Sequence, residues 1–269
     1  DIGPFQAYGL ETQLNGKLWR PALKGLNIKL GPNASVCFDT ERLRIAASWT
    51  GGFLKLPTGR DGLEGVPKIV GKLAFHTPMT PGWAGPKGEW IEPTPPTKKG
   101  NDLYSMGPLP RAWAKWRGHY RAGQRVVLSY TIGSTKVLEM PDYDPAVGGI
   151  FIRWFDIAKI DQELVQHMLV AEEPGGVGEE HESGFLARLG KGGIVTSVSV
   201  LMRQNIHDPH HSLHIKDGKI LYRLGETMNQ HTFGIAIWRG PKEKFAAYQK
   251  HLKKLDSKEP PSLAKLTKG

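Results

Sequence analysis

Four histidines lie within eight residues in the last third of the chain, in the stretch HDPHHSLH at residues 207–214. Imidazole nitrogens bind zinc, copper and heme iron, so the candidate metal ligands are His207, His210, His211 and His214. Side chains alternate between the two faces of a strand, so a strand here would place His210 and His214 on one face and His211 on the other. No His-Glu-x-x-His motif accompanies them. The alternative is a polar lead-in to a hairpin, whose histidines titrate at the surface or bond to backbone carbonyls.

A second candidate site lies at residues 111–121, where aromatic and basic side chains are interleaved in the stretch RAWAKWRGHYR. Flat aromatic faces stack on sugar rings, and arginine donates hydrogen bonds to hydroxyl, carboxylate or sulfate oxygens. These residues therefore favour a glycan, and their positive charge favours an anionic one. The alternative is that the tryptophans fill the core of a large sandwich. The ligand-binding candidates are Arg111, Trp113, Trp116, Arg117 and Tyr120.

The sequence contains no catalytic signature. There is no Gly-x-Ser-x-Gly nucleophile elbow, and the glycine-rich residues 189–193 lack the spacing of a phosphate-binding loop. Cys37 is the one cysteine, so the chain can form neither an internal disulfide nor the Cys-x-x-Cys-His attachment of a c-type heme. We therefore lean towards a chain without an activity of its own and assign no catalytic residue. We expect no cofactor in this chain; the alternative is a transition metal at the histidines.

The chain is basic, with 36 lysines and arginines against 26 acidic residues and a net charge of +10. About half of this charge follows Gly240, where eight lysines face three acids. A helix with a solvated basic face accounts for it, and no helix-turn-helix, zinc-finger or RNA-recognition pattern is present, so we expect no nucleic-acid partner. No run of 18 apolar residues exists, so we expect no membrane span.

The elements that must position these residues are strands and tight turns. Residues 125–131 are rich in β-branched and aromatic side chains, and Gly133 starts a turn into a return strand over residues 136–140. The Asn-Gly pair at residues 15–16 and the Asp-Gly pair at residues 217–218 predict two further hairpins. Gly and Pro together number 53 residues (33 + 20), which suits many short strands.

The pattern predicts an all-β protein: a large two-sheet β-sandwich, in the extreme a supersandwich, with one C-terminal amphipathic helix. Each sheet is expected to hold six or more strands. The β-sandwich domain covers residues 1–240 and includes a loop-rich insertion at residues 57–101. The helix covers residues 241–256, because apolar side chains there recur at helical spacing. Residues 257–269 are polar and interrupted by proline, which predicts a linker to a missing downstream domain.

Three long stretches carry a resemblance to a known family: residues 38–56 (FDTERLRIAASWTGGFLKL), residues 65–84 (GVPKIVGKLAFHTPMTPGWA) and residues 108–141. They resemble an uncharacterised N-terminal domain of large exported bacterial proteins of the c-type-cytochrome and sugar-dehydrogenase-like propeller kind. The resemblance spans nearly the whole chain. It implies a periplasmic or extracellular location, with propeller and cytochrome c domains of the same parent protein as partners. It carries over no catalytic residue.

Three functional hypotheses follow. The first is a non-catalytic accessory module of an exported, carbohydrate-directed redox protein, which binds a glycan or packs on a propeller or cytochrome partner. The second is a metal-dependent or heme-contacting enzyme domain built on residues 207–214. The third is a purely structural interface domain, for which we expect exposed apolar area near the final helix.

Overall fold

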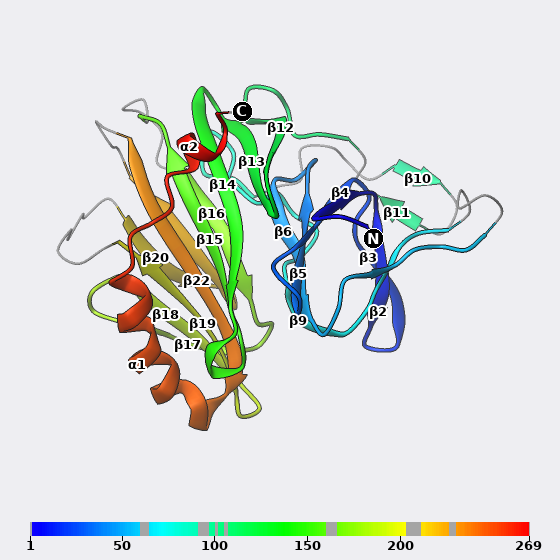
Figure 1. Cartoon of the computed structure of the whole chain (residues 1–269). Helices are drawn as coiled ribbons and strands as arrows, with labels where there is room; N and C mark the ends of the chain where they lie inside the picture. The colour runs from blue at the N-terminus through cyan, green and yellow to red at the C-terminus, as the bar shows by residue number, and fades with distance from the viewer. Residues whose placement is uncertain are drawn as a thin grey trace.

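The computed structural model of the protein describes residues 2–59, 65–90, 97–99, 102–104, 107–159, 166–202, 211–225 and 230–268. Almost all of its regular structure is β-strand, and its long helix lies near the C-terminus (Figure 1). The predicted all-β, sandwich-like class with a C-terminal helix is therefore confirmed. No helix in these ranges combines the length and the apolar character that crossing a membrane requires.

An eight-stranded antiparallel sheet forms the main layer (Figure 1). The hairpin predicted from residues 125–140 lies near one end of it. In spatial order its strands are β12 (Ala114–Ala122), β13 (Arg125–Ile132), β14 (Thr135–Asp144), β15 (Ile150–Ile157), β22 (His231–Pro241), β19 (Ile194–Leu201), β18 (Leu186–Lys191) and β17 (Val177–Glu180).

The second layer consists of two smaller sheets rather than one sheet of six or more strands. The five-stranded sheet contains, in spatial order, β1 (Phe5–Ala7), β4 (Gly25–Lys29), β5 (Ala34–Asp39), β6 (Arg44–Thr50) and β9 (Lys72–His76). The three-stranded sheet contains β16 (Gln166–Glu172), β21 (Lys219–Leu224) and β20 (His211–Lys216). The expectation of two comparable sheets was wrong because the second layer is interrupted between β9 and β16.

Two peripheral sheets complete the fold. The four-stranded one consists of β3 (Lys17–Ala22), β2 (Leu10–Leu14), β8 (Lys68–Ile69) and β7 (Leu54–Lys55), and the two-stranded one consists of β10 (Thr97–Lys99) and β11 (Asp102–Tyr104). Strands β7 to β11 fall within or beside the predicted loop-rich insertion at residues 57–101. Residues 60–64, 91–96 and 100–101 of this region lie outside the described residues.

The turns form where glycine allows a positive φ. Asn15 and Gly16 have φ values of 51° and 76° between β2 and β3, as an Asn-Gly hairpin turn requires. Asp217 and Gly218 have φ values of 51° and 70° between β20 and β21. The predictions of these two hairpins are confirmed. Gly71 is required for a different reason, which is steric: a Cβ added at this position would lie 2.1 Å from the carbonyl oxygen of Thr50.

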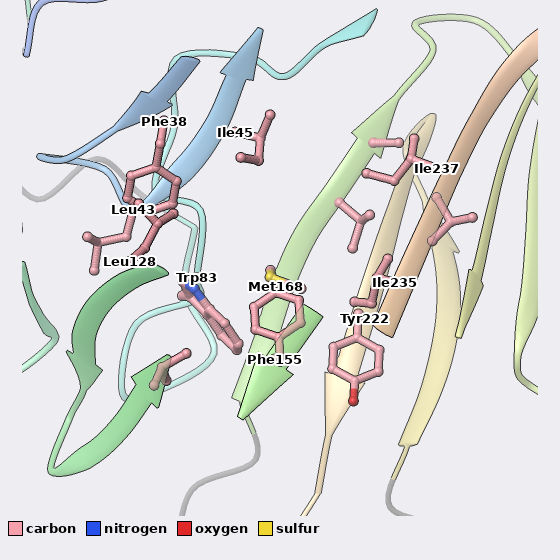
Figure 2. Packing of buried hydrophobic residues seen from close by; sticks show 14 of the residues in the cluster. Phe38, Leu43, Ile45, Trp83, Leu128, Phe155, Met168, Tyr222, Ile235 and Ile237 are labelled. Atoms are coloured by element: carbon pink, nitrogen blue, oxygen red, sulfur yellow. The ribbon is translucent and has the colours of Figure 1, made fainter. Parts of the chain in front are cut away.

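One large apolar core fills the space between the two layers (Figure 2). It joins Phe38 of the five-stranded sheet to Leu128 and Phe155 of the eight-stranded sheet and to Tyr222 of the three-stranded sheet. We call the face of the eight-stranded sheet that carries this core its inner face. Its opposite, outer face carries a second apolar cluster that includes Val127 and Trp154.

The C-terminal helix α1 (Phe245–Asp256) packs on the outer face. Phe245, Tyr248 and Leu255 are buried there, so the predicted amphipathic spacing is confirmed. The chain also contains two single 3-10 turns: η2 (Ala146–Gly148) between β14 and β15, and η3 (Lys242–Lys244) directly before α1. Residues 257–269, for which we predict a linker, contain a short helix, α2 (Leu263–Leu266), whose Leu263 is buried in the outer cluster.

Candidate ligand-binding groove

A β-bulge in β12 divides the predicted ligand-binding residues between the two faces of the sheet. Trp116 pairs with Tyr130 of β13, but the next paired residue of β12 is Gly118, so Arg117 is the extra residue. Beyond the bulge, His119 pairs with Leu128 of the inner core. The bulge therefore directs Trp116 and His119 to the inner face, although simple alternation would separate them.

Arg117 and Tyr120 lie on the outer face. Tyr120 pairs with Val127, which belongs to the outer apolar cluster, and directly paired residues project to the same side of a sheet. Arg117 and Tyr120 line the same groove, which we call the outer groove. The structure thus brings together two of the five predicted ligand-binding residues.

The other three predicted residues have different surroundings. Trp113 is buried in the main core, and its indole N–H donates a hydrogen bond of 3.1 Å to the carbonyl of Trp83. The alternative interpretation of this tryptophan as a core residue therefore holds. Arg111 is exposed in the turn before β12 and lines neither groove described here. Trp116 is half-buried, with its ring 5.6 Å from that of Phe38.

Trp116 and His119 line a separate inner groove of about 460 Å³, together with Tyr8 and Lys24. The edge of the Phe5 ring meets His119, with 4.5 Å between the ring centroids. Burial lowers the pKa of His119 below its usual value. Burial thus disfavours the charged imidazolium of His119. Lys24, the lysine of this groove, is paired with Glu41 at 3.0 Å.

The outer groove has a volume of about 540 Å³ and runs over the outer face of β12 to β15. The exposed side chains of Arg117, Tyr120 and Lys136 contribute an aromatic ring and two positive charges. The carboxylate of Asp156 is buried and accepts a hydrogen bond from the side-chain amide of Gln230, which also lines the groove. Two cations and one carboxylate leave the groove with an excess of positive charge.

The C-terminal segment forms one wall of the outer groove. Ala264 of α2 and Thr267 after it both line the groove. They are held in place because Leu263 is buried in the outer apolar cluster, and the Thr267 hydroxyl donates to the carbonyl of Ala264 at 3.0 Å. A segment predicted as a linker is therefore part of the candidate site.

Sequence reasoning missed three residues of this groove: Lys136, Asp156 and Gln230. Lys136 could have been predicted from the sequence, because the predicted hairpin pairs the strand that contains it with residues 125–131. Asp156 and Gln230 reach the groove through β15 and the approach to β22, whose positions in the sheet order have no local signal.

The predicted metal ligands are also divided. His211 of β20 is buried, whereas His214 is exposed and has its Nε2 2.8 Å from the hydroxyl of Ser212. The predicted placement of His211 and His214 on opposite faces of the strand is confirmed by this burial pattern. His207 and His210 lie outside the described residues. Within the described ranges, no group of three or more His, Cys, Asp or Glu side chains is placed to hold a metal ion.

The structure instead places His231 beside His211. Nε2 of His211 lies 3.3 Å from Nδ1 of His231, the first residue of β22. These two strands belong to different layers, so no local signal in the sequence predicts that the two imidazoles meet.

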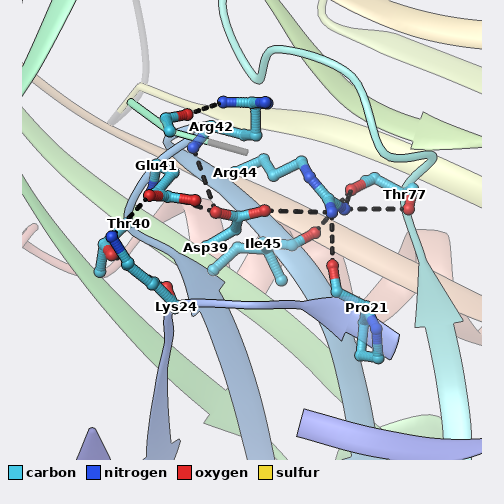
Figure 3. A network of polar contacts seen from close by, with 10 residues as sticks. Pro21, Lys24, Asp39, Thr40, Glu41, Arg42, Arg44, Ile45 and Thr77 are labelled. Atoms are coloured by element: carbon cyan, nitrogen blue, oxygen red, sulfur yellow. Dashed lines mark hydrogen bonds and ion pairs between the residues drawn. The ribbon is translucent and has the colours of Figure 1, made fainter. Parts of the chain in front are cut away.

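A buried polar network surrounds Asp39 at the β5–β6 hairpin (Figure 3). Arg44 donates to Asp39 at 3.2 Å and to the carbonyl and hydroxyl of Thr77 at 3.1 and 3.0 Å. Burial raises the pKa of Asp39, and burial lowers the pKa of Arg44. The backbone N–H groups of Glu41 and Arg42 also donate to Asp39, so the network holds the turn between the two strands. Glu41 connects it to Lys24 of the inner groove.

Exposed apolar side chains do not gather at the final helix, contrary to the expectation for an interface there. In the described part of the chain, the large exposed hydrophobic residues are Tyr8, Leu18, Leu56, Val70, Tyr120 and Val177. Leu18, Leu56 and Val70 lie on or next to strands of the small four-stranded sheet. The apolar side of α1 is covered by the eight-stranded sheet.

Comparison with known proteins gives a family match that lies almost entirely in the first half of the chain. No curated protein matches the sequence. The match to a family model covers two of the three stretches that carry the resemblance described above and nearly all of the third, and it contains Arg117, Tyr120 and Lys136 of the outer groove. No link to cytochrome or dehydrogenase proteins accompanies this match. Residues 36–139 match the family described as a domain of unknown function, DUF6797.

Proposed function

We propose that this chain is a non-catalytic binding module whose outer groove takes an anionic sugar unit of a glycan. The observation that carries the proposal is the grouping of the exposed Tyr120 ring with Arg117 and Lys136 over one groove of about 540 Å³. A volume of this size is within the range of small-molecule sites.

Each group has a distinct part in the proposed recognition. The Tyr120 ring offers a flat apolar face on which the C–H groups of a sugar stack. Arg117 supplies paired N–H donors that match a carboxylate or sulfate, and Lys136 adds a second positive charge. The Asp156 carboxylate, positioned by Gln230, accepts a hydrogen bond from a sugar hydroxyl.

The backbone of the groove supports a preformed site. Its residues lie mostly on four neighbouring antiparallel strands, whose ladders restrict side-chain positions more than loops do. The α2 segment closes one side. The ligand therefore meets a surface that needs little ordering, which reduces the entropic cost of binding.

The wider setting is proposed from the resemblance. Exported proteins with sugar-dehydrogenase-like propellers and cytochrome c domains would use such a module to hold a glycan near the redox domains. This setting implies a periplasmic or extracellular location and a carbohydrate-directed parent protein. The chain itself, with its one cysteine, lacks the motif for covalent c-type heme.

The test is calorimetric titration of the untagged protein against neutral, carboxylated and sulfated oligosaccharides of matched length. We expect binding of anionic glycans that weakens as salt is added, because salt screens the two cations. Tyr120→Ala and Arg117→Gln are each expected to weaken binding about tenfold or more, equivalent to roughly 1.4 kcal/mol.

The structure offers matched controls for both variants. Tyr8 is 47% exposed against 44% for Tyr120, but it lines the inner groove, so Tyr8→Ala should leave binding unchanged. Arg121 is an exposed arginine of the same strand that lies outside the outer groove, so Arg121→Gln should also have no effect. Absence of binding to every glycan, or an equal loss in Tyr8→Ala, would contradict the proposal.

A further inference from the structure

We infer that His211 and His231 form a transition-metal site between the two layers of the sandwich, with copper(II) as the preferred ion and zinc(II) as a weaker one. This inference does not depend on the glycan proposal, because neither histidine lines the outer groove. It also differs from the ligand set expected from the sequence, since it pairs one residue of that set with a histidine 20 positions later.

The distance between the imidazoles fits a shared ion. Nε2 of His211 and Nδ1 of His231 are 3.3 Å apart. Two nitrogens that each bind a metal at about 2.0–2.1 Å with a tetrahedral angle between them lie about 3.3 Å from each other. A tetrahedral ion such as zinc(II), placed to one side of the line between the two nitrogens, fits this separation. Copper(II), whose neighbouring ligands lie at about 90°, needs the two nitrogens about 2.9 Å apart, which a small rotation of the half-buried His231 ring provides without a rearrangement of the strands.

The second nitrogen of His211 already has the partner that a metal-binding histidine requires. Its Nδ1 is hydrogen-bonded to the hydroxyl of Tyr222, which is fully buried on β21. When one ring nitrogen of a histidine binds a metal, a hydrogen bond to the other ring nitrogen fixes the orientation and the tautomer of the ring. With Tyr222 acting on Nδ1, the Nε2 atom of His211 is left facing His231.

Aromatic packing holds the pair in place. The ring of Phe233 meets His211 at 5.3 Å and Tyr222 at 5.2 Å. Phe233 is stacked in turn on Phe155 of the main core, with 5.1 Å between the centroids. His211 is therefore a rigid ligand, and metal binding does not have to pay for ordering its ring.

The site has an accessible side. His211 is 2% exposed, but His231 is only half-buried, so solvent reaches the pair from the His231 side. Two imidazoles leave further coordination positions for water or a small ligand. Imidazole ligands suit copper and zinc, and the Irving–Williams order places copper(II) above zinc(II) at the same site.

His214 is excluded from this site by its position. It projects from the opposite face of β20, where its ring contacts Ser212 at 2.8 Å and lies 4.0 Å from Glu180. His214 therefore provides a matched control on the same strand, three residues from His211.

The experiment is titration of the untagged, metal-stripped protein with copper(II), followed by calorimetry and electron paramagnetic resonance. We expect one equivalent of copper with hyperfine structure from two nitrogens. His211→Gln and His231→Gln should each weaken binding at least tenfold, and His214→Gln should not change it. Because metal binding displaces a proton, the affinity should rise with pH.

A second variant separates ligation from folding. Tyr222→Phe keeps the buried ring and removes the hydroxyl that positions His211, so it should weaken copper binding several-fold while circular dichroism shows an unchanged fold. No copper binding by the wild-type protein, or full binding in the double variant H211Q/H231Q, would overturn the inference. The glycan titrations repeated on H231Q should be unaffected, which keeps the two proposals distinguishable.

Discussion

Glu139 and Arg153 form an ion pair inside the main core, on the inner face of β14 and β15. Arg153 donates to Glu139 at 2.6 and 3.0 Å, and the hydroxyl of Tyr130 donates to the same carboxylate at 2.7 Å. All three side chains are almost fully buried. Burial, followed by the charge of Glu139, raises the pKa of Tyr130, so the phenol remains a donor at all ordinary pH values.

This pair leads to a prediction at the scale of single residues. Glu139→Leu should lower the free energy of unfolding by about 3–5 kcal/mol, because it leaves the Arg153 guanidinium buried without a counter-charge. The double variant E139L/R153L should recover most of this loss, since it removes both charges. Chemical denaturation of the three proteins measures the difference, and a double variant as unstable as E139L would show that the charges themselves are not the cause.

At the scale of elements, the contact between α1 and the end of β14 joins the helix to the sheet outside the apolar cluster. Nε2 of His251 lies 3.1 Å from Oδ2 of Asp144, and Lys258 lies 3.8 Å from the same oxygen. Burial alone would raise the pKa of Asp144. The backbone N–H of Ala146, the hydrogen bond from His251 and the two positive charges outweigh it and lower that pKa below its ordinary value of 3.8.

The lowered pKa predicts how the helix contact depends on pH. Folding favours the ionised form of Asp144, so its contribution is fully present above about pH 4 and is lost as the pH falls through the lowered value. Asp144→Asn should reduce the free energy of unfolding at pH 7 by about 0.5–1 kcal/mol and have little effect at pH 2. Asp217→Asn makes the same chemical change in an exposed turn that tolerates Asn-Gly, and it should show no such pH dependence.

At the scale of the whole molecule, Trp83 connects the two layers (Figure 2). Its backbone forms an isolated bridge with Met168 of the three-stranded sheet, and its ring lies 6.5 Å from those of Tyr130 and Phe155 in the eight-stranded sheet. The loop-rich insertion thus fills the interruption in the second layer between β9 and β16. Of the two tryptophans in this region, Trp83 is fully buried and Trp90 is half-buried, so Trp83 is the one that holds the insertion to the core.

Replacing this tryptophan should destabilise the whole sandwich. Trp83→Ala leaves a large cavity between the layers and is expected to cost about 3–5 kcal/mol. Trp90→Ala, in the same insertion, should cost markedly less because the side chain is only half-buried. Thermal and denaturant unfolding of both variants test the difference, and equal losses would mean that Trp83 has no special position in the core.

Several elements of the fold were predictable because their signals are local. The Asn15–Gly16 turn needs two residues with positive φ, and few residue pairs allow this. The β-branched and aromatic side chains of residues 125–131 reflect the preference of a strand. The recurrence of Phe245, Tyr248 and Leu255 reflects the period of a helix. Each of these signals lies within a window of about a dozen residues.

The candidate sites were only partly predictable. Arg117 and Tyr120 were chosen because aromatic and basic residues lie together in the sequence, but one extra residue in β12 turned Tyr120 away from the face of Trp116 and towards that of Arg117. Such a bulge changes the facing of every later side chain in the strand, and the sequence of the bulged strand alone does not reveal it. Trp113 was a binding candidate by composition and is a core residue by position.

The sequence by itself determined the all-β class, the tight hairpins, the amphipathic final helix and the absence of a c-type heme motif, because each depends on residue type and short spacing. The tertiary structure decided which side chains meet. It brought Asp156 and Gln230 into the outer groove, placed His231 against His211, and placed Ala264 and Thr267 of the expected linker along the groove. These contacts join residues far apart in the chain, and they depend on strand order and layer packing, which no local pattern encodes.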